Sequence, residues 1–446
     1  MVATVTALRS SANAVSYFEK DGYYAKDSPE HRDASFWHGK AAADAGLKAH
    51  VLPHEFEDVL DGWVPGTEIR LGRLREGEHD HRPGWDITLS APKSVSLEGL
   101  VMGDRRVIRA HDDAVRATLG WIETDLLQTR SWDPITRQRP RVAADGMIVA
   151  GFRHLTSRGG DPQLHTHCVL ANMTRNASGE WRSVEPTAIR RSEKLIGAYY
   201  RNELAMRLQA MEMAVTPTLI GRVPGFELAG YAKSFLDAFS GRRRDILAYL
   251  EKHDLPYTAE LAQMAALATR PPKRETGLAE LVPGWREKAR ALGLARDKAV
   301  LRPARPLDPA TGKQVPAVEV APPDLPANEL RSLRRAPKLP PLPRDPGLAE
   351  LGKAHAPEAA TAAALSAAPE TGVLEAVARA VDHVSERRST VSEAEIRAVA
   401  LGHAPGRYTL ADVDRAVTQL VRDGKLIEVE RRSMDRAFVT DAAVRS

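Results

Sequence analysis

The chain has 446 residues, enough for two or three domains, and its 43% hydrophobic and 27% charged residues are typical of a soluble globular protein. The 63 basic residues exceed the 59 acidic ones by only four, so the charge allows a nucleic-acid partner without demanding one. A single cysteine, Cys168, excludes an intramolecular disulfide framework, and no apolar run approaches the roughly 18 residues that a membrane-spanning helix needs.

The N-terminal segment lacks the basic start and apolar core of a secretory signal, so we expect a cytoplasmic protein without membrane insertion. It carries three tyrosines, Tyr17, Tyr23 and Tyr24, within SYFEKDGYYAKD. A tyrosine phenolate can attack a phosphodiester and hold the DNA end, but its ordinary pKa of about 10 means that it needs activation. Two tyrosines in one site would allow a second transfer, although such a cluster taken alone more often packs in a core.

A short β-rich run at 86–90, DITLS, predicts a strand, and Ala91-Pro92 then suits the first turn of a helix over 93–127. Asp86 opens this strand. Its carboxylate is suited to accept a hydrogen bond from a metal-bound histidine, or to draw the proton from a tyrosine. The alternative for a lone aspartate is the commoner structural role at a strand end or turn.

Two more strands are predicted over 146–152 and 164–173, where short β-rich runs are bounded by glycine or alternate in polarity. Helices are predicted over 189–211 and, for the most part, from 233 to 292. Strands separated by long helices leave an α/β and an α+β architecture open.

The strongest chemical pattern is His154-x10-His165-x-His167. Side chains alternate along a strand, so His165 and His167 face the same side. The loop through 159–162 can return the chain so that the two strands pair and His154 supplies a third nitrogen. Three protein ligands leave coordination positions open, as in catalytic metal sites. The alternatives are unrelated surface or core histidines and a structural zinc site.

The identity of the ion is less constrained than its ligands. Imidazole nitrogens suit zinc, nickel or manganese, whereas magnesium prefers oxygen ligands, which phosphate and water can supply. We expect a divalent metal ion, with Mg²⁺ or Mn²⁺ favoured and Zn²⁺ or Ni²⁺ as alternatives.

Basic and aromatic residues suggest where nucleic acid would bind. Cationic side chains can contact phosphates and tryptophans can stack on bases, although each of them has an equally common structural role. The candidates are Arg70, Arg73, Arg75, Arg82, Arg242, Arg243, Arg244, Trp85 and Trp181.

A change of composition predicts the domain organisation. Residues 301–346 hold 12 of the 30 prolines, so we expect an N-terminal domain over 1–298, a Pro/Ala-rich linker over 299–370 and a small module over 371–446. The module begins with a helix over 373–384, and capping-box patterns at 392–395 and 409–412 predict two more helices. Alternating runs at 426–430 and 436–440 predict a hairpin, which together favours a winged-helix-like module.

Three segments together resemble the conjugative relaxases of the MobF family, which belong to the HUH endonucleases. They are SYF…YYAKD near the start, W-Asp86-ITLSAPKSVSL, and FRHLTSRGGDPQLHTHCVLANMT. They occur in the family's order and spacing, and the resemblance extends over residues 1–298. It implies an α+β fold, in which helices flank an antiparallel β-sheet with the histidine strands at its centre.

The resemblance also implies an activity: metal-dependent cleavage of one DNA strand at the nic site of an origin of transfer, by tyrosine transesterification. Tyr17 would attack first and form a 5′-phosphotyrosine link, and Tyr23, with Tyr24 beside it, would serve the transfer that rejoins the strand. The three histidines would hold the metal, and Asp86 would act as base or orient a histidine. Expected partners are single-stranded DNA, an origin-of-transfer hairpin, accessory relaxosome proteins and coupling proteins.

The sequence departs from this family at two places. Phe18 follows Tyr17, where relatives often have a second tyrosine. Relatives also commonly continue into a helicase, but the nearest match to a P-loop here, at 347–354, ends in alanine where serine or threonine should hold magnesium. The C-terminal module resembles the start of that helicase region, so we expect either a piece of a longer relaxase-helicase or a shortened relaxase.

Other functions remain as alternatives. A rolling-circle replication initiator would use the same chemistry at a replication origin. A non-catalytic DNA-binding regulator would bind a hairpin regardless of Tyr17 or metal. A metal-dependent hydrolase would cleave DNA without forming a covalent intermediate.

Overall fold

A central antiparallel sheet organises the protein in the computed structural model, which describes residues 3–20, 34–47, 50–220, 223–269, 278–293, 371–386, 390–429 and 436–440. Its strand order is β1-β5-β9-β8-β2, and β10 pairs with β9. The bounds are β1 Ala3–Ala7, β2 Ser35–His38, β5 Gly84–Ser90, β8 Met147–Thr156, β9 Pro162–Arg175 and β10 Trp181–Arg182. Every neighbouring pair is antiparallel, which confirms the α+β architecture over the α/β alternative.

The three strands predicted around the chemistry are present, and the histidine strands β8 and β9 lie at the centre of the sheet as expected. Their burial explains this position. Residues 168–174 of β9 are all buried, because both faces of this part of the sheet are covered. Toward residue 162 the pattern changes to alternation between buried and half-buried side chains, so one face becomes accessible there.

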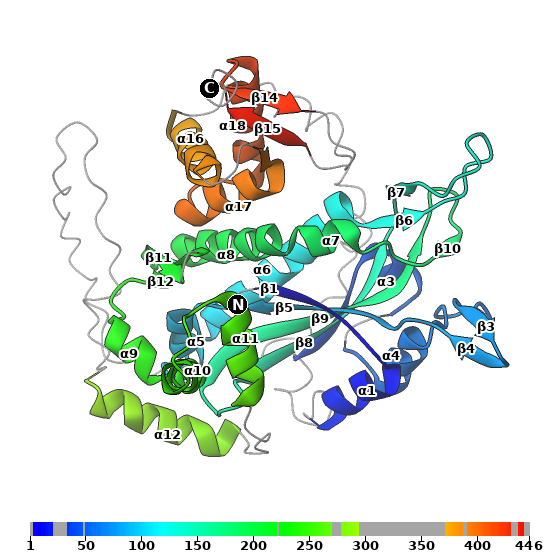
Figure 1. Cartoon of the computed structure of the whole chain (residues 1–446). Helices are drawn as coiled ribbons and strands as arrows, with labels where there is room; N and C mark the ends of the chain where they lie inside the picture. Colours follow the sequence, from blue (N-terminus) through cyan, green and yellow to red (C-terminus); the bar gives the residue numbers. More distant parts are fainter. Residues whose placement is uncertain are drawn as a thin grey trace, which may run out of the picture. The chain divides into compact units, whose positions relative to one another are not determined.

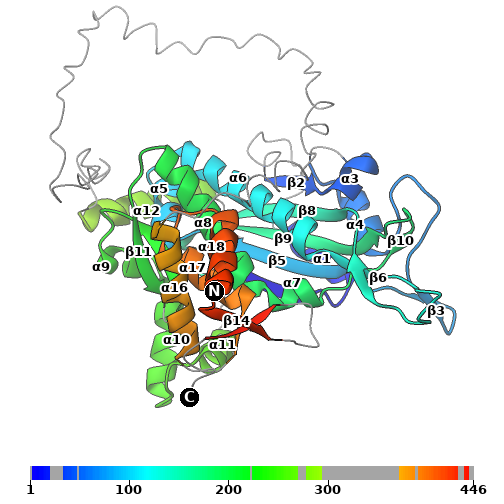
Figure 2. The same cartoon turned by 90° about the horizontal axis from the view of Figure 1, so that it is seen from above.

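Helices cover the sheet on both faces (Figures 1 and 2). One hydrophobic core joins inward side chains of β5 and β9 to α5 Lys93–Leu100, α6 Arg105–Trp121 and α8 Glu193–Ala210. A second core, on the other face, joins Phe152 of β8 and Val169 of β9 to α1 Ser11–Lys20, α3 Lys40–Asp44 and α4 Pro53–Leu60. The two cores follow from the two-residue period of the strands.

The long predicted helices are interrupted. The segment 93–127 forms α5, α6 and a π-helical turn, η1 Ile122–Leu126, because Gly103 adopts φ +80° and Asp104 then caps α6 by accepting from the Arg106 amide. The segment 189–211 forms α7 Thr187–Arg191 and α8. The segment 233–292 contains α9 Lys233–Ala238, α10 Gly241–Lys252, α11 Ala259–Ala268 and α12 Leu278–Ala291.

Three two-stranded ribbons extend this framework. They are β3 Arg73–Arg75 with β4 Glu78–Asp80, β6 Gln128–Arg130 with β7 Arg141–Ala143, and β11 Val215–Ile220 with β12 Val223–Leu228. The first two project at the same end of the sheet in Figure 1.

The C-terminal segment has the helices and strands predicted for it. They are α16 Thr371–Ser385, β13 Val391–Ser392, α17 Glu393–His403, α18 Leu410–Arg422, β14 Leu426–Val429 and β15 Ala437–Thr440. Both capping boxes are formed, by Ser392 with Glu395 and by Thr409 with Asp412. The small sheet has the order β13-β15-β14. The winged-helix assignment and the domain boundaries stay predictions, and the linker 299–370 with the P-loop-like run 347–354 lies outside the described residues.

Within the part of the chain that the structure describes, no helix combines the length and apolar character required to cross a membrane.

Close packing beside the histidine strand β8 gives a first testable prediction. A Cβ atom added at Gly151 would lie 2.3 Å from the ring of Phe36, and the Arg116 guanidinium lies 4.0 Å from the centroid of the same ring. We expect Gly151→Ala to lower the free energy of unfolding by about 1–3 kcal/mol through overpacking, measured by denaturant titration. Gly120→Ala is the control, since nothing lies within 4 Å of its added Cβ. Equal stability of the two variants would contradict the prediction.

Candidate metal centre

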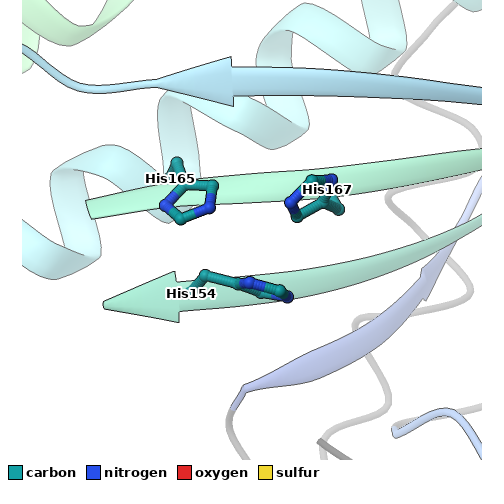
Figure 3. Close-up of side chains that lie close together, drawn as sticks. All are labelled: His154, His165 and His167. Carbon is teal, nitrogen blue, oxygen red and sulfur yellow. The ribbon is translucent and has the colours of Figure 1, made fainter. Parts of the chain in front are cut away.

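Three histidines meet on one face of the sheet (Figure 3). His154 of β8 lies directly opposite His165 of β9 in the antiparallel register, and His167 follows two residues later on the same side. Ring centroids are 5.0 Å apart for His154 and His165, 4.6 Å for His154 and His167, and 5.2 Å for His165 and His167. The candidate ligand nitrogens all lie within 4.8 Å of one another. The predicted strand return therefore brings the three rings together.

Hydrogen bonds fix which nitrogen two of these rings present. Nδ1 of His165 lies 3.0 Å from the Gln163 carbonyl oxygen, and Nδ1 of His167 lies 2.7 Å from Oδ2 of Asp86. A carbonyl and a carboxylate only accept, so both Nδ1 atoms donate. The lone pair of each ring is then on Nε2, which is the arrangement that metal-binding histidines use.

Burial keeps two of the three rings, those of His154 and His165, uncharged. Desolvation, together with the neighbouring His167, lowers the pKa of His165 to about 4. Desolvation, followed by the charges of His167 and His165, also lowers the pKa of His154 well below its ordinary value. Both rings are thus neutral at pH 7 and ready to donate a lone pair. Three imidazoles in this arrangement fit a divalent cation with coordination positions left for water or phosphate.

The position of Asp86 in strand β5 places its side chain on the sheet face of the three histidines. Trp85, Ile87 and Leu89 of β5 face the α6/α8 core, so Asp86 and Thr88 face the histidines. The Thr88 hydroxyl lies 3.4 Å from each Asp86 carboxylate oxygen and 3.1 Å from His167 Nδ1. Asp86 is therefore hydrogen-bonded to the His167 ring, and its role in the site stays a prediction.

The tyrosine positions are only partly visible. Tyr17 lies in helix α1, and its side chain is outside what the structure describes, as are Tyr23 and Tyr24 entirely. Helix α1 itself is well placed: its buried residues Ala14 and Val15 belong to the core that also contains Phe152 and Val169. Phe152 and Val169 share their sheet face with the three histidines, because each is separated from a histidine by two residues along its strand. The helix that carries Tyr17 thus packs on the histidine face.

The remaining candidates divide into structural and exposed residues. Trp85 is buried in the core, so it is not available for stacking on bases. Arg242 donates to the carbonyls of Thr269 and Ala266 at the end of α11, and Arg244, although exposed, donates to the carbonyl of Ala238, the last residue of α9. These two arginines therefore cap helices, which is the structural alternative. Arg70, Arg73, Arg82 and Arg243 are exposed, Trp181 is half-buried, and the Arg75 side chain lies outside the described residues.

Sequence reasoning missed Lys93 and Thr88, although both lie in the segment that contains Asp86. Lys93 Nζ donates to the Pro162 carbonyl at 2.8 Å and to Oε1 of Gln163 at 3.3 Å, and so holds the turn that leads into the histidine strand. Burial lowers the pKa of Lys93 to about 8. Its place at the start of a predicted helix, just after the Asp86 strand, was the available signal.

Comparison with known proteins identifies one family. The model of the TrwC relaxase family matches residues 11–292. The multifunctional conjugation protein TraI of Escherichia coli K12 is 31% identical over 327 residues, which are 70% of this chain and 18% of that protein, and a second E. coli TraI is 32% identical over 299 residues. The chain thus spans less than a fifth of the length of these relatives.

Solved structures of TrwC are similar to the chain over two thirds of its length. TrwC in complex with oriT DNA, in a metal-bound structure, is 32% identical with a TM-score of 0.58, and the match covers 66% of this chain and 98% of that one. TrwC with a 27-mer DNA comprising the recognition hairpin and the cleavage site is 31% identical with a TM-score of 0.57 and the same coverage.

Proposed function

Because the chain belongs to the TrwC relaxase family, we propose that it is a conjugative relaxase. It cuts one DNA strand at the nic site of an origin of transfer, remains linked to the 5′ end through a tyrosine and later rejoins the strand. The observation that carries this proposal is the shared sheet face: three clustered histidines, the carboxylate that bonds to one of them, and the helix bearing Tyr17.

In the first step, Tyr17 Oη attacks the phosphorus of the scissile phosphodiester. The new bond is a phosphotyrosine to the 5′ end, the broken bond is the one to the 3′ oxygen, and that oxygen takes up a proton to leave as a hydroxyl. A divalent ion, when bound by His154, His165 and His167, polarises the phosphate and stabilises its extra charge. Mg²⁺ or Mn²⁺ is proposed, since phosphate and water would supply the remaining oxygen ligands.

The second step reverses the first with different reactants. A 3′ hydroxyl attacks the phosphotyrosine, the phosphodiester forms again and the tyrosine oxygen recovers a proton. Tyr23, with Tyr24 beside it, is proposed to accept a second DNA 5′ end in the transfer that completes rejoining. With two tyrosine nucleophiles in one site, each phosphodiester bond that is broken is replaced by a phosphotyrosine bond. Rejoining the strand therefore requires no external energy source.

Asp86 is proposed as a positioning residue, because its carboxylate already accepts from Nδ1 of His167. Asp86→Asn should weaken metal binding about 10-fold or more, as loss of such a partner does in other metal sites. We expect cleavage to fall at limiting Mn²⁺ and to recover at saturating Mn²⁺, measured as the rate against metal concentration. A rate that stays low at every metal concentration would instead assign Asp86 as the base.

The DNA hairpin is proposed to bind across the two projecting ribbons. The β3–β4 ribbon presents Leu74, 78% exposed, and the Arg70 guanidinium lies 5.0 Å from the ring centroid of nearby Trp63. The loop between β6 and β7 presents Trp132 and Ile135, which is 91% exposed. A two-stranded ribbon fits the major groove of a duplex, and exposed apolar and cationic side chains contact bases and phosphates there. Accessory relaxosome and coupling proteins are proposed as further partners.

The test is a DNA-cleavage reaction with the whole chain. Single-stranded DNA from the element's own transfer region, containing the hairpin and nic site, is mixed with protein and Mn²⁺ and run on a denaturing gel. We expect a protein–DNA adduct that disappears with chelator and returns when Mn²⁺ is restored. Cleaved DNA without any adduct would favour the hydrolase, and hairpin binding without cleavage would favour the regulator. Cleavage only at a replication origin would favour the rolling-circle initiator.

A further inference from the structure

Behind the metal centre, on the opposite face of the sheet, a threonine lies between two of the ligands. Thr166 separates His165 from His167 in β9, so its side chain points away from them, toward α6. Its hydroxyl lies 2.8 Å from Nε2 of His111, and Nδ1 of His111 lies 2.6 Å from the hydroxyl of Tyr200 in α8. Thr166 and His111 are both 0% exposed.

The third ligand has an equivalent neighbour on the next strand. Arg153 precedes His154 in β8, and its register partner across the strands is Thr166. The Arg153 guanidinium forms an ion pair with Asp112, the residue that follows His111 in α6. Two consecutive residues of one helix thus hold the two strand positions that lie among the three metal ligands.

The hydrogen bond between Thr166 and His111 is important for stability because both side chains are fully buried. A buried polar group without a partner costs far more than an exposed one, so the hydroxyl of Thr166 and the ring of His111 depend on each other. Desolvation, followed by the charge of Arg153, lowers the pKa of His111 to about 3, so its ring is neutral and bonds through both nitrogens. The α6 helix is itself packed against α8 within the core. Helix α6 therefore holds Thr166 of β9 and Arg153 of β8 in place.

We propose that His111 and Asp112 position the metal ligands through the backbones of β9 and β8. A shift of the Thr166 backbone moves His165 and His167 together, since each is joined to it by one peptide bond. A shift at Arg153 moves His154 in the same way. The inference rests on the proposed metal-binding role of the three histidines. His111 and Asp112 are positioning residues, because they act on the strands from the sheet face opposite the three histidines.

The test removes one hydroxyl and measures binding of Mn²⁺ alone to the whole chain by calorimetry. Thr166→Val keeps the volume and β-branching of the side chain but cannot bond to His111. We expect its dissociation constant for Mn²⁺ to rise about 10-fold, in the range found when a supporting contact of a metal ligand is lost. Thr166→Ser, which keeps the hydroxyl, should bind Mn²⁺ within about twofold of the parent.

Thr174→Val is the matched control. Thr174 lies on the same strand, is equally buried at 0% exposed, and makes one hydrogen bond, 2.7 Å to the Gly146 carbonyl. It should lose stability to denaturant as Thr166→Val does but keep the Mn²⁺ affinity of the parent. Equal weakening in both variants, or parental affinity in Thr166→Val, would overturn the positioning role alone. A parent chain that does not bind Mn²⁺ would remove the metal site and, with it, the inference.

Discussion

Tyr17→Phe is expected to abolish the covalent protein–DNA adduct and to slow cleavage at the nic site by at least about 10⁴-fold, as loss of a nucleophile does in other enzymes. The substitution removes one oxygen atom, and that oxygen is the proposed point of attachment to DNA. The readout is the adduct band on a denaturing gel, quantified over time with saturating Mn²⁺. Binding of the uncleaved hairpin DNA should stay at the parental level, because phosphate and base contacts elsewhere carry it.

Two sets of variants make this result specific. Tyr257→Phe removes the same atom from a tyrosine that is 58% exposed on the segment between α10 and α11, and it should cleave normally. Tyr23→Phe and Tyr24→Phe should still form the first adduct. Loss of the second transfer in these variants is measured with a substrate that supplies a 3′ hydroxyl. An adduct that persists in Tyr17→Phe and vanishes in Tyr23→Phe would reverse the assigned order of the two nucleophiles.

His165→Ala is expected to reduce metal-dependent cleavage by about 10²–10³-fold, which corresponds to the several kcal/mol of charge stabilisation that a bound ion provides. His165 is chosen because it faces His154 across the strands and shares its own strand with His167. The same variant should lose high-affinity binding of Mn²⁺ in calorimetry. Its affinity for hairpin DNA in the presence of chelator should match that of the parent.

His253→Ala controls for loss of an imidazole elsewhere, since His253 is exposed after α10 and contacts only its own helix through the Tyr249 carbonyl and ring in the interactions described. This control should retain metal binding and cleavage. A His165→Ala protein that binds Mn²⁺ and cleaves at the parental rate would exclude the three histidines as the metal site. Loss of hairpin binding together with cleavage would point to disturbed folding of the central strands, which denaturant titration would then detect.

The sequence predicted the site to the extent that local rules govern it. A two-residue period puts His165 and His167 on one side, and Gly159-Gly160 with Asp161-Pro162 permits the return that places His154 opposite. The same period places Asp86 and Thr88 on one face of β5. The capping boxes at Ser392 and Thr409 were equally predictable, because a capping box is formed by four consecutive residues.

Sequence patterns predicted less reliably where helices end and which groups the charged side chains contact. Gly103 breaks the predicted helix 93–127, and Arg242 and Arg244 cap neighbouring helices although their run is typical of a phosphate-binding cluster. Trp85 is buried by the α6 and α8 packing. In each case the competing structures have similar local propensities, and the choice depends on contacts with residues that are distant in sequence.

By itself, then, the sequence determined the three histidines as candidate ligands, their spacing along the strands, and the family, because those depend on residue identity and on strand geometry. Only the tertiary structure decided that Asp86 bonds to His167 rather than standing apart, that α1 packs on the histidine face, and that Thr166 and Arg153 are held from behind by His111 and Asp112. Asp86 and His167 are 81 residues apart in the sequence, His111 and Thr166 are 55 apart, and Asp112 and Arg153 are 41 apart, so no local pattern encodes these contacts. They form because strand pairing and the burial of two apolar faces bring these polar groups together inside the protein, where a buried polar group without a partner is costly.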